Sequence, residues 1–284
     1  MKNSLLKFSL LVLLFSQFAF AQWNKGKGNG YYKVSASYLV ADEHFTSTRK
    51  KDPNATRGNF VASVYAEHGI GNKLDLIAYL PLFTRVYQNE QVSKTSGAIL
   101  VPGEAVNSIG DIELGARLGV IKNDYLALST TVKLGLPTGK KEGGADGSLQ
   151  TGDGEFNQLL LIDLGFPFKI KNQNSYGKIY SGFNNRTNGF SDELHYGAEI
   201  GTKFNNAFFV ALKFSNVSSL NNGNLTGTGQ GVFANNVEFT NLGGELAYYV
   251  TPKLGVMVNY THVLTGKITF AAPTYTAGLF MDIQ

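Results

Sequence analysis

A strict alternation of apolar and polar residues over residues 112–136 most constrains what this chain can fold into. Residues 112–120 place apolar side chains in one phase and charged residues and glycines in the other. The pattern resumes at Leu126 after the short turn Lys122-Asn123-Asp124. Successive side chains of a strand point to opposite faces, so this period of two predicts an amphipathic hairpin. Such a hairpin suits a membrane barrel, with lipid outside and water inside, and it suits a soluble two-sheet sandwich equally.

The same period recurs along the rest of the chain. Twelve segments show it, and most have the length of about ten residues that a tilted strand needs to cross a bilayer. The segments cover residues 31–45, 57–68, 74–87, 112–120, 126–136, 155–166, 176–186, 193–204, 207–216, 237–249, 253–264 and 274–283.

The connections between these segments alternate between turns and loops, and every loop except 188–192 is longer than every turn. Five short turns fall at residues 69–73, 122–124, 169–174, 205–206 and 250–253, and six longer loops at 46–56, 88–108, 138–154, 188–192, 216–236 and 265–273. A sandwich gives no reason for this interleaving, whereas a membrane barrel has short turns at one end and long loops at the other. We therefore expect an all-β, transmembrane, up-and-down antiparallel β-barrel of about twelve strands over residues 31–284, with a periplasmic sandwich as the alternative.

The N-terminus predicts export. A short positive region and a mostly apolar run, residues 8–18, precede the small-x-small sequence Ala19-Phe20-Ala21. This is typical of a secretory signal peptide over residues 1–21, because the apolar run is too short to span a membrane. Cleavage would remove two lysines and take the formal net charge from +4 to +2. Residues 22–30, rich in glycine and lysine, are expected to form a flexible periplasmic lead-in to the barrel.

Several classes of function are disfavoured by what the sequence lacks. The chain has no cysteine, which excludes thiolate catalysis and cysteine-based metal sites. It has no polybasic block, so nucleic acid is not an expected partner. The histidines have no metal-ligand spacing, and no nucleophile elbow or phosphate loop is present. We expect neither an enzyme nor a bound cofactor or metal. Asp146, Asp153 and Glu155 could hold calcium, but their spacing matches no known calcium loop and a solvated acidic loop is favoured.

The polar phase of the strands predicts which residues face the interior. Charges facing lipid would cost about 2–4 kcal/mol each near the middle of the membrane, so the apolar phase must point outward. The candidate lumen-lining residues are Lys33, Glu67, Asp75, Arg85, Glu113, Arg117, Lys133, Asp163, His195, Glu199, Lys213 and Glu245. These charges either line a permeation path or pair across the lumen and seal it, and twelve strands allow both.

The last strand carries a candidate insertion signal. Thr276-x-Gly278-x-x-Met281-x-Ile283 is similar to the pattern that the barrel-assembly machinery recognises, with Gly278, Met281 and Ile283 as its main residues. The usual pattern ends on an aromatic residue, whereas this chain ends with Ile283 and Gln284. We expect the assembly machinery and the lipid bilayer as partners.

Glycine-rich strand ends carry a resemblance to a known family. They are Gly110-Asp111, Leu114-Gly115, Leu136-Pro137-Thr138-Gly139, Leu149, Thr151-Gly152 and Gly154. With them the chain resembles the phenol-degradation meta-pathway transporter family of outer-membrane proteins, distantly similar to long-chain fatty-acid transporters. The resemblance implies a monomeric barrel that admits small hydrophobic or aromatic molecules, and it brings no catalytic residues. The long N-terminal plug of the fatty-acid transporters is absent, because only residues 22–30 precede the first strand.

The sequence thus predicts a Gram-negative outer-membrane channel for passive uptake of small molecules, with the substrate left open. The alternative is a structural or surface-interaction barrel whose outer loops, 88–108 and 216–236 above all, bind a partner without transporting solute.

Overall fold

The computed structural model describes residues 24–224 and 233–284. The expected signal peptide, residues 1–21, lies outside the described residues. Within them, no helix is long and apolar enough to cross a membrane.

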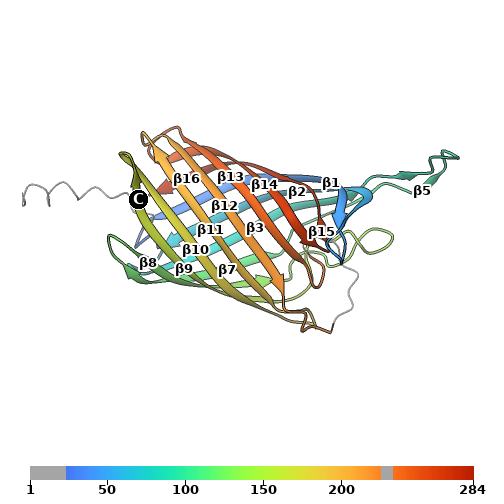
Figure 1. Cartoon of the computed structure of the whole chain (residues 1–284), viewed down its shortest axis with the longest axis horizontal. Coiled ribbons are helices and arrows are strands. Elements are labelled where there is room, and N and C mark those ends of the chain that lie inside the picture. Colours follow the sequence, from blue (N-terminus) through green and yellow to red (C-terminus); the bar gives the residue numbers. More distant parts are fainter. Residues whose placement is uncertain (1–23, 225–232) are drawn as a thin grey trace, which may run out of the picture.

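The chain forms a closed antiparallel barrel of twelve strands (Figure 1). Eleven of its strands are single elements: β1 (Gly30–Phe45), β2 (Lys51–Gly69), β3 (Leu74–Gln88), β8 (Ala127–Leu136), β9 (Asn157–Ile170), β10 (Gln173–Arg186), β11 (Glu193–Phe204), β12 (Phe208–Ser219), β13 (Glu238–Tyr249), β14 (Leu254–Lys267) and β16 (Thr274–Ile283). The remaining strand consists of β6 (Glu104–Ser108) and β7 (Ile112–Lys122), which both pair with β3. The barrel closes where β1 pairs with β16, with Ser35 opposite Gly278. This confirms the fold predicted from the period of two.

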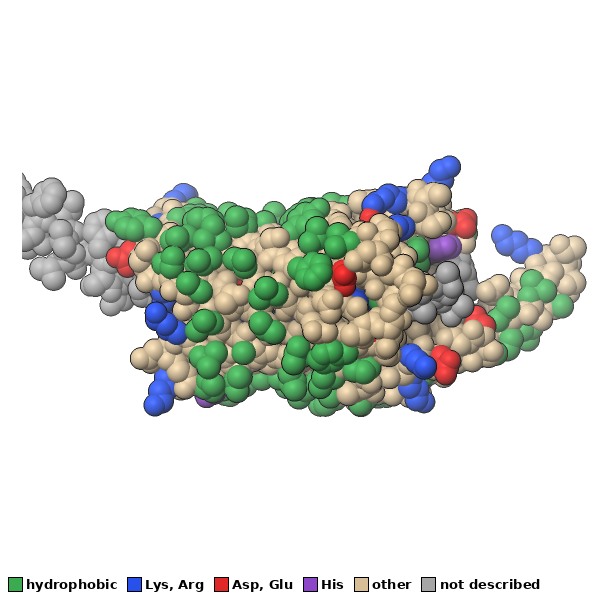
Figure 2. Space-filling view, turned by 90° about the horizontal axis from the view of Figure 1, so that it is seen from below, with side chains coloured by type: hydrophobic (Ala, Val, Ile, Leu, Met, Phe, Trp, Pro, Cys, Tyr) green, Lys and Arg blue, Asp and Glu red, His purple; other side chains and the backbone are tan. Residues whose placement is uncertain are grey.

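The outer surface of the wall is apolar. The strands expose large apolar side chains at many alternate positions, as with Val34 at 60%, Leu212 at 54% and Leu279 at 65% exposed. Figure 2 shows these side chains over the length of the barrel, whereas Lys and Arg gather toward its two ends. A closed sheet has no unpaired strand edge, and its continuous apolar band needs lipid to cover it. This is the surface of a transmembrane barrel.

The two ends of the barrel differ as the connection lengths predicted. The terminal end carries the five short turns and the C-terminus, and the loop end carries the longer connections (Figure 1). The loop between β3 and β6 contains a hairpin of β4 (Gln91–Val92) and β5 (Ile99–Val101), which projects away from the barrel (Figure 1). A short strand, β15 (Thr269–Phe270), pairs with the end of β1.

The segment before β1 is bound to the barrel rather than extending freely from it. Asn24 is buried and donates through Nδ2 to the carbonyl of Asn72 at 2.7 Å. The amide of Lys25 donates to Asp75 Oδ2 at 2.8 Å. The expectation of a flexible lead-in therefore does not hold for the described residues 24–29. The period of two could not show this, because the segment has none.

The predicted inward position of Arg85 is wrong. The pairing of β2 with β3 is irregular, since Ala62 lies opposite Phe83 while Val64 lies opposite Leu80. This bulge adds a residue to β3 and reverses the phase of everything after it. Arg85 consequently shares the exposed face with Phe83, and its guanidinium lies 6.0 Å from the ring of Tyr87, near the loop end of the strand.

Candidate functional site: the barrel lumen

The lumen contains two main cavities, one toward each end of the barrel. The inner cavity, toward the terminal end, has a volume of about 370 Å³. The outer cavity, toward the loop end, has a volume of about 440 Å³. Both are of the size that holds a small organic molecule.

One wall of the inner cavity is a row of alternating charges across five neighbouring strands, which we call the charge ladder. It consists of Asp163, Lys178, Glu199, Lys213 and Glu245, all of which except the buried Asp163 line the cavity. Glu199 lies directly opposite both lysines in the strand registers. Lys178 Nζ lies 3.1 Å from Asp163 Oδ1, and Lys213 Nζ lies 2.7 Å from Glu245 Oε2. Each lysine of the ladder is therefore paired with an acid along the wall, and the third acid, Glu199, leaves the ladder with one net negative charge.

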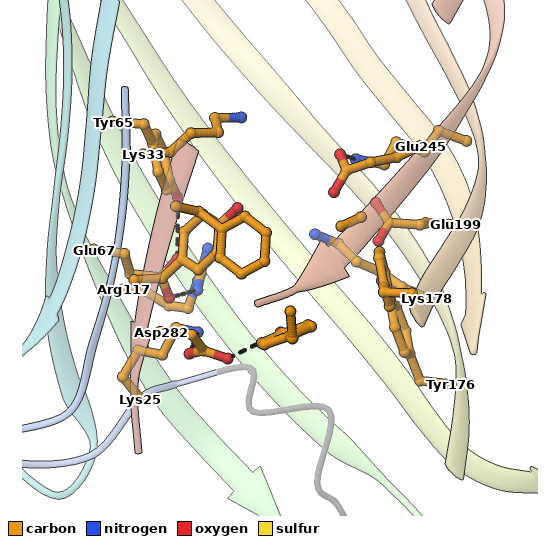
Figure 3. Close-up of a pocket in the computed structure, with 16 residues that line it drawn as sticks. Lys25, Lys33, Tyr65, Glu67, Arg117, Tyr176, Lys178, Glu199, Glu245 and Asp282 are labelled. Atoms are coloured by element: carbon orange, nitrogen blue, oxygen red, sulfur yellow. Dashed lines mark hydrogen bonds and ion pairs between the residues drawn. The ribbon is translucent and has the colours of Figure 1, made fainter. Parts of the chain in front are cut away.

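Aromatic rings lie among charged side chains on the facing wall, where Figure 3 labels Tyr65 beside Lys33 and Glu67. Tyr31 stacks on Phe280 with ring centroids 5.7 Å apart, and it meets Tyr65 edge-on at 6.2 Å. Tyr249 contacts Phe280 edge-on at 4.9 Å. These rings come from neighbouring strands and point inward, so they do not belong to the membrane-facing surface. We call Tyr31, Tyr65 and Phe280 the aromatic platform.

Two ion pairs lie close to the platform. Arg117 on β7 pairs with Glu67 on β2, and Tyr65 also donates to Glu67 at 3.0 Å. Lys25 from the N-terminal segment lies 3.8 Å from Asp282 on the last strand. All of these pairs join neighbouring or nearly neighbouring segments of the wall rather than its opposite sides.

The loop of residues 137–156 folds into the mouth of the outer cavity. Leu149 in this loop is fully buried, and Thr151 is almost so. Asp111, at the break between β6 and β7, fastens both ends of the loop. Its Oδ1 accepts the amide of Gly139 at 2.8 Å and its Oδ2 accepts the amide of Asp153 at 2.9 Å.

This arrangement explains the glycine-rich strand ends that carry the family resemblance. A Cβ on Gly152 would lie 2.2 Å from Asp111 Oδ1, and a Cβ on Gly139 would lie 2.6 Å from the carbonyl oxygen of Thr151. Thr138 Oγ1 donates to the carbonyl of Gly110 at 2.7 Å. Residues scattered over more than forty positions of the sequence therefore form one contact region.

Arg186 binds three carboxylates beside this loop. Its Nε donates to Glu155 Oε1 and its Nη1 to Glu193 Oε1, each at 2.8 Å, and its Nη2 donates to Asp153 Oδ2 at 3.2 Å. The arginine is buried and holds the loop acids, which were expected to be solvated, against the barrel wall. Burial raises the pKa of Glu155 to about 7, although Arg186 acts in the opposite direction. In residues 24–224 and 233–284 no group of three acidic or histidine side chains is placed to hold a metal ion.

The structure places eleven of the twelve predicted lumen residues in three inward-facing groups. Lys33, Glu67, Arg117, Glu199, Lys213 and Glu245 line the inner cavity, and Glu113, Lys133 and His195 line the outer cavity. Asp75 and Asp163 point inward but are buried, Asp75 against Lys25 and Asp163 against Lys178. Arg85 lies on the outer face.

Several lining residues lie outside the set that the sequence predicts. They include Lys25, Tyr31, Lys178, Arg186 and Asp282. Lys178 and Asp282 both occupy the inward phase of their strands, so the period of two could have identified them. Lys25 and Arg186 are placed by tertiary contacts that no local pattern encodes.

The candidate insertion residues lie on β16 in both phases. Gly278 is in the inward phase, where a Cβ would lie 2.7 Å from the carbonyl oxygen of Val34. Met281 is 37% exposed on the outer face, and Ile283 has the same phase. The close contact of Gly278 with β1 gives this glycine a role in barrel closure.

Comparison with solved structures places the chain among membrane barrels. It is similar to the COG4313 outer membrane channel from Pseudomonas putida F1, with a TM-score of 0.64 and 14% identity over 94% of this chain and 100% of that chain. It also aligns with the NanC porin, with a TM-score of 0.49 and 9% identity over 89% of this chain and 99% of that chain. The CymD monoaromatic hydrocarbon channel gives a TM-score of 0.43 and 9% identity over 91% and 89%. No family model and no curated protein matches the chain.

The first of these likenesses shows a shared fold. Together with the closed twelve-stranded sheet, it defines the chain as a transmembrane β-barrel.

Proposed function

We propose that the protein is a channel that passes small molecules through the outer membrane. The observation that carries this proposal is the direction of the charge pairs. The acids and bases of the inner cavity pair along the wall, as in Lys213 with Glu245, and so leave about 370 Å³ of the lumen unfilled. A barrel sealed by its charges would pair them across the lumen instead.

Three independent features favour export of the protein and its insertion into a membrane. The signal peptide predicted over residues 1–21 directs the chain to export, and a strand barrel with an apolar belt requires a bilayer. The likeness of the fold to an outer membrane channel favours the outer membrane of a Gram-negative cell. In this proposal the assembly machinery inserts the chain as a monomer through Gly278, Met281 and Ile283.

The solute in this proposal is small and aromatic or hydrophobic. The aromatic platform offers ring faces and edges to such a molecule inside the lumen. The resemblance of the glycine-rich strand ends to the phenol-degradation meta-pathway transporter family favours the same class.

Planar-bilayer conductance of the refolded protein, combined with solute flux into liposomes, tests the channel. We expect single-channel events and faster entry of benzyl alcohol than in protein-free liposomes. The proposal would be overturned if no channel events occurred and benzyl alcohol entered no faster than into protein-free liposomes.

A second candidate function is binding of a protein partner by the loop end. The projecting β4–β5 hairpin exposes Val92, Ile99 and Leu100, and Leu100 is 66% exposed. Deletion of residues 90–102 should then abolish capture of the partner while leaving conductance unchanged. Retained capture after the deletion would exclude the hairpin as the binding surface.

A further inference from the structure

We infer that the inner cavity binds an aromatic carboxylate, with Lys33 as the group that holds the carboxylate. The inference rests on the proposed channel function and assigns a solute class to it. It derives from one cation that has no carboxylate oxygen of the described chain within 4 Å and from the rings that surround it.

Among the described residues, Lys33 is the one cation of the inner cavity without a carboxylate oxygen within 4 Å. Each of the other four has an acidic partner: Lys25 pairs with Asp282, Arg117 with Glu67, Lys178 with Asp163 and Lys213 with Glu245. An ammonium in a confined lumen gains most from a charged acceptor, which a solute can supply.

The acids of the cavity do not compete strongly for this position. Glu199 lies between the two lysines of the charge ladder in the strand registers and accepts a hydrogen bond from Tyr176. Glu67 accepts from Arg117 and Tyr65. Each lining carboxylate thus has a hydrogen-bond or ion-pair partner in the wall other than Lys33.

The surroundings of Lys33 are aromatic on both sides. Its paired residue on β2 is Tyr65 and its paired residue on β16 is Phe280. Its ammonium lies 5.9 Å from the ring centroid of Tyr65, and Tyr31, two positions earlier on the same face, stacks on Phe280. Figure 3 shows Lys33 and Tyr65 on one wall and the acids of the ladder, Glu199 and Glu245, on the other.

This geometry matches a ligand with a ring and an anionic group at its edge. The ring would pack on the platform, and the carboxylate would accept a hydrogen bond from Lys33. A simple carboxylate lacks the ring contacts, and an uncharged aromatic molecule lacks the ion pair. Benzoate has both features and fits a cavity of about 370 Å³.

The test compares fluxes of benzoate, acetate and benzyl alcohol into liposomes that contain the full-length protein. Potassium salts with valinomycin keep the flux of the anions electroneutral. The variants are Lys33→Met, Lys33→Arg and, as a matched control, Lys51→Met at an exposed lysine of the loop end. Heat-modifiable gel migration confirms that each variant is folded.

We expect benzoate to enter faster than acetate in the wild type. Lys33→Met should lower the ratio of benzoate to benzyl alcohol flux by about tenfold, the factor that one charge-assisted hydrogen bond supplies. Lys33→Arg should keep most of the ratio, and Lys51→Met should keep all of it.

Two outcomes separate this inference from the channel itself. If benzyl alcohol enters but the ratio is the same in Lys33→Met and the wild type, the carboxylate site is wrong and the channel stands. If none of the three solutes enters faster than into protein-free liposomes, the channel fails and the inference fails with it.

Discussion

Arg186 joins the loop of residues 137–156 to the barrel wall. It is buried and shared by Asp153, Glu155 and Glu193. We expect Arg186→Gln to lower the free energy of unfolding by about 3–5 kcal/mol, because it leaves several carboxylates buried without their cation. Urea titration in detergent micelles measures the effect.

Arg49→Gln is the matched control for this prediction. Arg49 also pairs with an acid, Glu238, but its side chain is 52% exposed. We expect a loss below about 1 kcal/mol for this pair, since solvent screens it. Equal losses in the two variants would contradict the role assigned to Arg186.

The raised pKa of Glu155 predicts that the stability of the loop of residues 137–156 depends on pH. Its pKa in the folded protein is raised by burial to about 7, above its ordinary value near 4.3 in an unfolded chain. The folded state therefore holds the proton more tightly. The proton on Glu155 therefore stabilises the folded state fully below about pH 4, and this stabilisation is lost as the pH rises through about 7.

Digestion by trypsin at Lys140 and Lys141 reports on this loop. We expect faster cleavage at pH 8 than at pH 6 relative to a reference peptide, and Glu155→Gln should remove the difference. Asp146→Asn, in the same loop but exposed, should retain it. An unchanged pH dependence in Glu155→Gln would assign the effect to another group.

Three charged residues show where the prediction of inward positions from the sequence succeeds and where it fails. Glu113 and Lys133 were placed inward by phase alone, and their side chains pair at 3.2 Å within the outer cavity. Arg85 was misplaced because a bulge changes the phase without leaving a mark in the hydrophobic pattern. Phase is a local property, and a bulge is decided by the pairing with the neighbouring strand.

The loop of residues 137–156 packs closely against Asp111 because Gly152 has no side chain at the point of contact. Gly152→Ala would bring a Cβ to 2.2 Å from Asp111 Oδ1. We expect this variant to displace the loop and accelerate tryptic cleavage at Lys141 severalfold. Gly244→Ala, where the Cβ would have an ordinary contact of 3.6 Å, is the control and should be cleaved like the wild type. Equal cleavage in both variants would mean that the close contact does not hold the loop.

The strands and the lengths of their connections were predictable, whereas the positions of the loops were not. Alternation of apolar and polar residues marks the strands. It is less regular in β9, where the apolar Leu159 occupies an inward position and lines the outer cavity. The burial of Leu149 inside the mouth depends on contacts such as that of Thr151 with the carbonyl of Ile109, 42 positions earlier. Contacts of this separation have no periodic signature.

At the scale of the whole molecule, closure and orientation follow from the two ends of the sheet. The first and last strands pair over ten positions, from Gly30–Ile283 to Leu39–Thr274, so the barrel has no open edge there. With an even number of strands both ends of the barrel chain lie at the same end of the barrel. If that end faces the periplasm, the β4–β5 hairpin faces the outside of the cell.

The absence of native cysteine makes this orientation directly testable. Thr95→Cys places a thiol in the exposed hairpin turn, and Asp124→Cys places one in the short turn between β7 and β8. In intact cells, a maleimide too large for porins should label Thr95→Cys and leave Asp124→Cys unlabelled. After lysis both should react, which controls for thiol reactivity. Labelling of Asp124→Cys alone in intact cells would show the opposite orientation. A solute from outside the cell would then reach Lys33 from the terminal end of the barrel.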